Sequence, residues 1–214
     1  GRQEIALGDR WLVFEGTRPT PTLYFILTFA TIFFGCVNAC REIVKERPIF
    51  LRERLVNLEI PAYVASKAWI LSLLGFAQTL VFYAGVRWFL VLDGSPLLMV
   101  VVLYAGILAG TALGLLISAL VGSDVVALAL VPVVMIPQLL FSKLIMPNKA
   151  IEGLVAAMEQ ATLAKWSYAA MEQVVATPPE WWLLARSLGI LLAASLALVV
   201  GAGVVLRLKE VADG

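Results

Sequence analysis

The stretch that decides the fold runs from Gly94 to Ser123 and reads GSPLLMVVVLYAGILAGTALGLLISALVGS. It contains no charged residue over its whole length. A helix that crosses the hydrocarbon core of a bilayer needs about 20 mostly apolar residues, because each residue adds about 1.5 Å. This stretch therefore predicts a membrane-spanning helix that is long enough to cross with some tilt.

Four further charge-free runs flank this stretch. They cover residues 19–40, 68–86, 125–142 and 187–206. The polar segments between the runs could not cover so much apolar surface in a water-soluble protein. We therefore expect an all-α polytopic membrane helix bundle with five transmembrane helices. The expected spans are residues 22–40, 66–90, 96–121, 124–144 and 184–207.

The composition agrees with this fold class and excludes several functions. Of the 214 residues, 61% are apolar and 14% are charged, whereas soluble domains average about 45–50% and about 25%. A net charge of +1 gives no basic surface for nucleic acid. The chain has no histidine, which excludes imidazole metal ligands and histidine-based catalysis. We expect no catalytic residue and no metal site in this segment.

Polar groups within the expected spans are few. The charge-free runs hold no ionisable group of the kind that a proton- or voltage-driven carrier usually needs at membrane depth, so a secondary carrier is disfavoured. The amides of Asn38, Gln78 and Gln138 are expected to join helices, with a place along a pathway as the alternative. Cys36 and Cys40 are expected to be small packing residues, with a metal or redox pair as the alternative.

The loop after the first expected span indicates the orientation. Five basic residues lie within 14 positions, namely Arg41, Lys45, Arg47, Arg52 and Arg54. Short loops rich in Lys and Arg stay in the cytoplasm. We therefore expect residues 41–67 inside, residues 1–21 outside and the tail at 208–214 inside.

A short helix is predicted within this loop, over residues 48–57. Pro48 is compatible with a first helical position, and Leu51, Leu55 and Leu58 share one face at helical spacing. The pattern is typical of an interfacial amphipathic helix anchored by arginines. The alternative is a lever that contacts a cytoplasmic partner.

The third expected span carries a stripe of small residues. Gly106, Gly110 and Gly114 form two overlapping GxxxG units, a spacing that lets helix backbones approach closely in lipid. Packing within the chain is the simpler interpretation, and a dimer seam is the alternative.

The segment at 146–182 is too polar to cross the membrane cleanly and too apolar for a free loop. On the orientation above it is external, and it could dip into the outer leaflet as a re-entrant element. Trp181 and Trp182 mark the boundary at the start of the last span.

The sequence ERPIFLRER at residues 46–54, followed by Pro61, Tyr63 and Lys67, resembles the first cytoplasmic loop of ABC-2 type permeases. It is most similar to the G-subfamily ABC exporters and their bacterial relatives. Residues 114–120, Phe141 with Ser142, and residues 166–172 support the resemblance, which covers residues 22 to 207. The family has six spans, so the resemblance implies that the chain shows the second to sixth and belongs to a longer polypeptide.

The resemblance implies a homodimeric, ATP-driven exporter that works with a nucleotide-binding domain, fused upstream or separate, which binds ATP and Mg²⁺. The helix at 48–57 would be the coupling helix that docks on that domain. The residues implied in coupling are Glu46, Arg47, Phe50, Arg52, Glu53 and Arg54. Those implied in the substrate cavity are Thr31, Phe34, Asn38, Ile136 and Leu139, and those implied in a plug above it are Leu144 and Ile145.

An apolar cavity would favour an amphipathic or lipid-like substrate. The external segment has neither a cysteine nor an Asn-x-Ser/Thr site, which fits a bacterial member in the inner membrane. The alternative function is a membrane anchor or assembly platform that recruits a cytoplasmic partner without transport.

Overall fold

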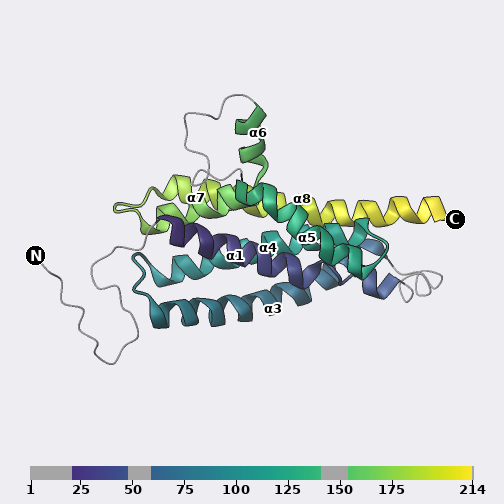
Figure 1. Ribbon diagram of the computed structural model, residues 1–214, viewed down its shortest axis with the longest axis horizontal. Helices are drawn as coiled ribbons and strands as arrows, with labels where there is room; N and C mark the ends of the chain where they lie inside the picture. Colours follow the sequence, from purple (N-terminus) through teal and green to yellow (C-terminus); the bar gives the residue numbers. More distant parts are fainter. Residues whose placement is uncertain (1–20, 48–58, 141–153, 214) are drawn as a thin grey trace, which may run out of the picture.

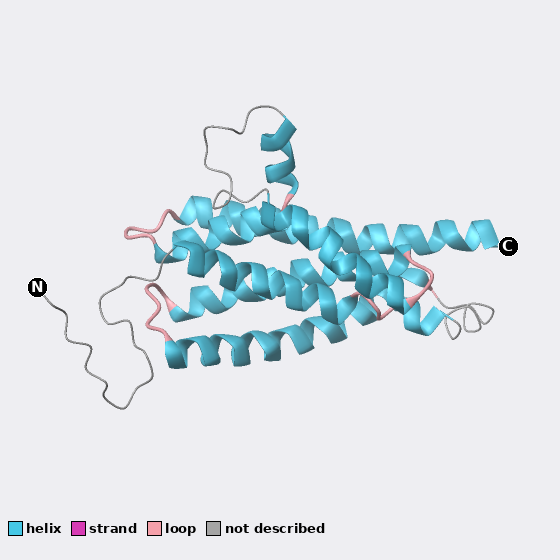
Figure 2. Ribbon diagram, viewed as in Figure 1, coloured by secondary structure: helices cyan, strands magenta, loops and turns pink. Residues whose placement is uncertain are grey.

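The computed structural model describes residues 21–47, 59–140 and 154–213, and in these ranges all regular secondary structure is helical. Figure 1 shows an elongated bundle in which most helices run along the long axis, and Figure 2 shows the short loops that join several of them. The elements are α1 (Pro21–Ala39), the 3-10 turn η1 (Val44–Glu46), α3 (Ile60–Phe89), α4 (Pro96–Leu120), α5 (Asp124–Leu140), α6 (Leu154–Ala161), α7 (Leu163–Val175) and α8 (Trp181–Asp213).

Four stretches of this bundle are long and apolar enough to cross a membrane: Pro21–Glu46, Ile60–Phe89, Pro96–Leu120 and Trp181–Lys209. The described part of α5 is a shorter apolar helix of 17 residues. The all-α class is therefore confirmed, with four candidate spans. Two helices differ from the expected bounds, because α3 begins at Ile60 and α8 continues to Asp213. The early start of α3 has a local cause, since Pro61 occupies its first turn, where proline is favoured.

The helix α4 lies at the centre of the bundle and packs against α1, α3, α7 and α8. Its contact with α1 is made through glycines. A Cβ atom added to Gly35 of α1 would lie 2.2 Å from the carbonyl oxygen of Ile107, and one added to Gly114 would lie 2.5 Å from that of Cys36. The small-residue stripe of α4 therefore serves packing within the chain, as the simpler interpretation expected.

The two ends of the bundle are named here by the segments that lie there, residues 41–47 at one end and residues 90–95 at the other. At the 41–47 end, the turn after α4 lies beside the segment that follows α1. At the 90–95 end, Gly94 has a φ of +105°, and a Cβ atom there would lie 2.5 Å from the carbonyl oxygen of Val174 in α7. Only glycine fits both this backbone conformation and this close approach.

The helices α6 and α7 do not extend along the whole bundle. Helix α7 packs against α1, α4 and α8, whereas α6 packs mainly against α7 and projects from the bundle in Figure 1. Val174 lies at Gly94 and Ser167 lies at Gly106, so α7 runs antiparallel to α4. The N-terminus of α7 is therefore the part of this helix that lies farthest along the bundle from the 90–95 end.

Candidate functional site

The candidate site lies at the 41–47 end, where the chain leaves α1. The hydroxyl oxygen of Ser118, near the end of α4, accepts hydrogen bonds from the backbone N–H groups of Ile43 and Val44, each at 3.0 Å. Ser118 is buried. Because buried backbone groups need a partner, this hydroxyl fixes the turn before η1 to the end of α4.

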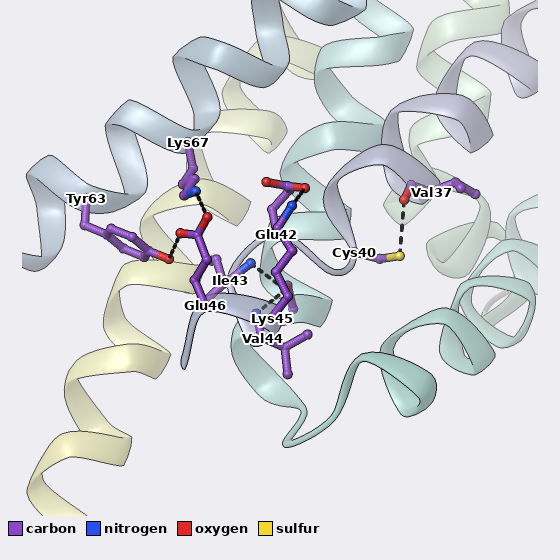
Figure 3. A network of polar contacts seen from close by, with 10 residues as sticks. Val37, Cys40, Glu42, Ile43, Val44, Lys45, Glu46, Tyr63 and Lys67 are labelled. Atoms are coloured by element: carbon purple, nitrogen blue, oxygen red, sulfur yellow. Dashed lines mark hydrogen bonds and ion pairs between the residues drawn. The ribbon is translucent and has the colours of Figure 1, made fainter. Parts of the chain in front are cut away.

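Glu46 joins the same segment to α3. Its carboxylate accepts a hydrogen bond from Lys67 Nζ at 2.5 Å and another from the Tyr63 hydroxyl at 3.2 Å. Figure 3 shows the Glu46 side chain directed toward both partners. The Lys67 nitrogen also lies 5.8 Å from the centre of the Tyr63 ring. The three side chains therefore tie η1 to the first turns of α3.

This ion pair differs from its neighbour in burial. The side chains of Lys67 and Glu46 are 16% and 29% exposed, whereas those of Lys45 and Glu42 are 46% and 23% exposed, so the difference lies in the lysine. Exposed pairs contribute about 0–1 kcal/mol, because water and salt screen them. The Glu46–Lys67 pair is therefore the better candidate for a firm connection, and the Glu42–Lys45 pair supplies a matched control.

The C-terminus of α4 receives a further cation from α8. Lys209 Nζ donates to the carbonyl oxygens of Leu120 at 2.8 Å and Val121 at 3.3 Å. A positive charge is favourable at a helix C-terminus, where carbonyl groups lack intrahelical partners. The segment at 41–47 and helix α8 are thus both bonded to the C-terminal end of α4, and the segment at 41–47 is also bonded to α3.

The structure describes two of the six predicted coupling residues. Glu46 and Arg47 are described, and a guanidinium nitrogen of Arg47 lies 3.7 Å from the position of a Cβ atom on Gly122. The helix predicted at 48–57 lies outside the described residues, and so do four of the residues assigned to coupling: Phe50, Arg52, Glu53 and Arg54. Their role stays a prediction.

Four connecting residues were not among the predicted site residues. Tyr63 and Lys67 could have been found, because they belong to the motif that carries the resemblance. Ser118 and Lys209 left no local signal, since their partners lie 75 and 89 positions away in the sequence.

Two of the predicted cavity residues lie together on the side of α1 that meets α3. Asn38 Nδ2 donates to Gln78 Oε1 at 2.6 Å. One turn away, the rings of Phe34 and Phe82 meet edge to face with centres 5.5 Å apart. The expected role of Asn38 and Gln78 in joining helices is thus confirmed.

The other predicted cavity residues lie elsewhere. Thr31 is fully buried, and its hydroxyl lies 2.5 Å from the position of a Cβ atom on Gly106. Ile136 and Leu139 are 55% and 36% exposed on α5. The plug residues Leu144 and Ile145 lie outside the described residues. A cavity that unites these side chains stays a prediction.

Comparisons with known proteins agree with the resemblance. The sequence profile of the family described as "ABC-2 type transporter" matches residues 5–175. The chain is also 29% identical over 163 residues to the ABC transporter ATP-binding/permease protein Rv1747 of Mycobacterium tuberculosis. That match covers 70% of this chain and 18% of the relative, so the chain spans less than a fifth of the relative's length.

Proposed function

The chain belongs to the ABC-2 type transporter family, and on that premise we propose that it works as the permease domain of an ATP-driven exporter. It is an integral membrane domain with four candidate spans, and we propose α5, extended past Leu140, as the fifth. In this proposal a nucleotide-binding domain hydrolyses ATP, two copies of the membrane domain form the pathway, and the host is a bacterial inner membrane. The relative is named as an ATP-binding/permease protein, which supports such a partner.

The observation that carries the proposal is the connection of Glu46 to Lys67 and Tyr63. Glu46 directly precedes Arg47 and the segment at 48–57, which we propose docks on the nucleotide-binding domain. A force applied to that segment would reach α3 through the ion pair and α4 through Ser118. The basic residues of the loop support a cytoplasmic position for this end of the bundle.

Alternating access would follow from this connection. Closure of the nucleotide-binding domains on ATP would push the two 48–57 segments, close the pathway on the cytoplasmic side and open it outside. In this account Phe34, Asn38, Ile136 and Leu139 contact an amphipathic or lipid-like substrate, and Leu144 and Ile145 close the cavity above it. Thr31 is fully buried against α4 and is left out of the contact set. The choice of substrate is supported by the apolar character of most of these residues, since an apolar cavity favours amphipathic or lipid-like ligands. Phe34 and Asn38 already contact Phe82 and Gln78 of α3.

The proposal is tested by reversing the ion pair in the assembled, ATPase-containing transporter. Ser66 is exposed on the first turns of α3, so a Ser66→Cys reporter can be labelled with a membrane-impermeant maleimide. We expect the labelling rate to change when ATP and vanadate are added. Glu46→Lys should abolish that response, because it leaves Lys67 facing a second cation.

Two further variants make the test specific. The double variant Glu46→Lys with Lys67→Glu should restore the nucleotide response, because the pair is rebuilt in the opposite direction. Glu42→Lys should leave the response intact, because it breaks only the more exposed pair. An identical nucleotide response in all variants would remove the proposed lever. The absence of any response in the unmodified protein would favour the anchor or platform instead.

A further inference from the structure

A third ion pair lies where α6 meets α7. Lys165 Nζ and Glu159 Oε1 are 3.6 Å apart, and their side chains are 18% and 9% exposed. The turn between them is held by local bonds, since the Thr162 hydroxyl donates to the carbonyl oxygen of Glu159 at 2.7 Å. The Trp166 indole N–H donates to the carbonyl oxygen of Gln160 at 2.8 Å. The pair therefore sits on an ordered turn.

The depth of this pair follows from its distance to α4. Ser167, two residues after Lys165, has its hydroxyl 3.2 Å from the position of a Cβ atom on Gly106. Gly106 comes ten residues after the start of α4 at Pro96, which is about 15 Å along the helix axis. The hydrocarbon core of a bilayer is about 30 Å thick. With Pro96 taken as the outer edge of the hydrocarbon core, as the expected span at 96–121 implies, the Glu159–Lys165 pair lies near the middle of that core.

The charge-free runs of the sequence supply no charged side chain at this depth. The Glu159–Lys165 pair comes instead from the segment at 146–182, between the fourth and fifth expected spans. Charged side chains inside a membrane are costly and usually mark binding sites or pathways. This pair is also incompletely satisfied. Among the described residues, Glu159 Oε1 and the fully buried Ser167 hydroxyl have no hydrogen-bond partner. A ligand that supplies donors would relieve the cost of these buried acceptors.

The Glu159–Lys165 pair lies close to the surface of the bundle. Met158 and Gln160, on either side of Glu159, are exposed. Among the residues that the structure describes, α6 packs mainly against α7. A site on a surface that faces the bilayer has lipids as its available ligands.

We propose that the Glu159–Lys165 pair binds a zwitterionic phospholipid headgroup, with the ammonium group at Glu159 and the phosphate at Lys165. The pair is neutral as a whole. A neutral headgroup that carries both charges satisfies each partner and leaves no net charge in the low-dielectric interior. An anionic headgroup would pair with Lys165 and leave Glu159 uncompensated, which is costly. This inference rests on the proposed function, because it names the substrate class as zwitterionic phospholipids.

Photocrosslinking to the complete, ATPase-containing transporter tests the proposal. The probes are phosphatidylethanolamine and phosphatidylglycerol with a diazirine next to the headgroup, each added to the protein in dodecyl maltoside micelles. We expect phosphatidylethanolamine to label the peptide at 158–168, and unlabelled phosphatidylethanolamine to compete roughly tenfold better than phosphatidylglycerol, as expected for one charged hydrogen bond. Equal competition by the two lipids would overturn the proposal, and this comparison needs no variant.

Variants identify the residues that bind the headgroup. Glu159→Gln keeps the shape of the side chain, removes its charge and should abolish the preference for phosphatidylethanolamine. Glu42→Gln removes one carboxylate at the 41–47 end and should leave the preference unchanged. Retention of the preference in Glu159→Gln would also overturn the proposal. If the nucleotide response at Ser66→Cys is present while the lipid preference is absent, the headgroup site fails and the exporter proposal stands.

Discussion

Gly110 of α4 lies directly against the backbone of α1 at Ile32, so closely that a Cβ atom on Gly110 would sit 1.9 Å from the Ile32 carbonyl oxygen. Both partners of this contact are backbone groups, and neither can move aside as a flexible side chain would. The position therefore sets the distance between the first helix of the bundle and its central helix.

Gly110→Ala should destabilise the protein, because the added methyl group forces α1 and α4 apart. Overpacking of this kind costs about 1–3 kcal/mol. Thermal unfolding in detergent should show a lower Tm for this variant. Gly203→Ala is the matched control, since nothing lies within 4 Å of a Cβ atom there. A Tm as high as that of the control would contradict the close packing of α1 on α4.

Ser118→Ala should loosen the turn before η1, because the N–H groups of Ile43 and Val44 lose their shared acceptor. We expect these two amides to exchange hydrogen roughly tenfold faster, as the loss of about 1.4 kcal/mol of local stability implies. Hydrogen–deuterium exchange with mass spectrometry measures this on the peptide at 41–47. Ser195→Ala serves as the comparison, since the Ser195 hydroxyl bonds within its own helix. Unchanged exchange at 41–47 in Ser118→Ala would show that another group holds the turn.

The amide pair of Asn38 and Gln78 should stabilise the contact of α1 with α3. A double-mutant cycle with Asn38→Leu and Gln78→Leu should give a coupling free energy of about 0.6 kcal/mol and at most about 1.7 kcal/mol, the range for hydrogen bonds between membrane helices. Unfolding in mixed micelles measures the four stabilities. A coupling energy of zero would mean that the 2.6 Å hydrogen bond contributes nothing net in lipid.

Much of the fold was predictable because lipid allows few solutions. Charge-free runs long enough to cross a bilayer must be helical, since every backbone group has to be satisfied within the segment. Pro61 and Pro96 both occupy first turns, as proline favours. The stripe at Gly106 and Gly114 predicted a close helix contact, although only the packing shows that its partner is α1.

The site was less predictable because its contacts are distant in sequence. Glu46 was named from a motif, but the Ser118 bonds join positions about 75 residues apart. The sequence also does not show which neighbour each face of an apolar helix contacts. Thr31 and Phe34 are three residues apart in α1, yet Thr31 faces α4 and Phe34 faces α3. The place of Lys165 beside the middle of α4 could not be predicted for a different reason, since α7 has only 13 residues and leaves no long apolar run.

The central claim is that the segment at 48–57 receives the force of an ATPase, and crosslinking from Phe50 tests it most directly. A photoreactive benzoylphenylalanine at Phe50 in the assembled transporter should crosslink to the nucleotide-binding domain. The same probe at Val91, which is 71% exposed at the opposite end of the bundle, should not. Crosslinking from Val91 and none from Phe50 would place the ATPase at the wrong end and contradict the account.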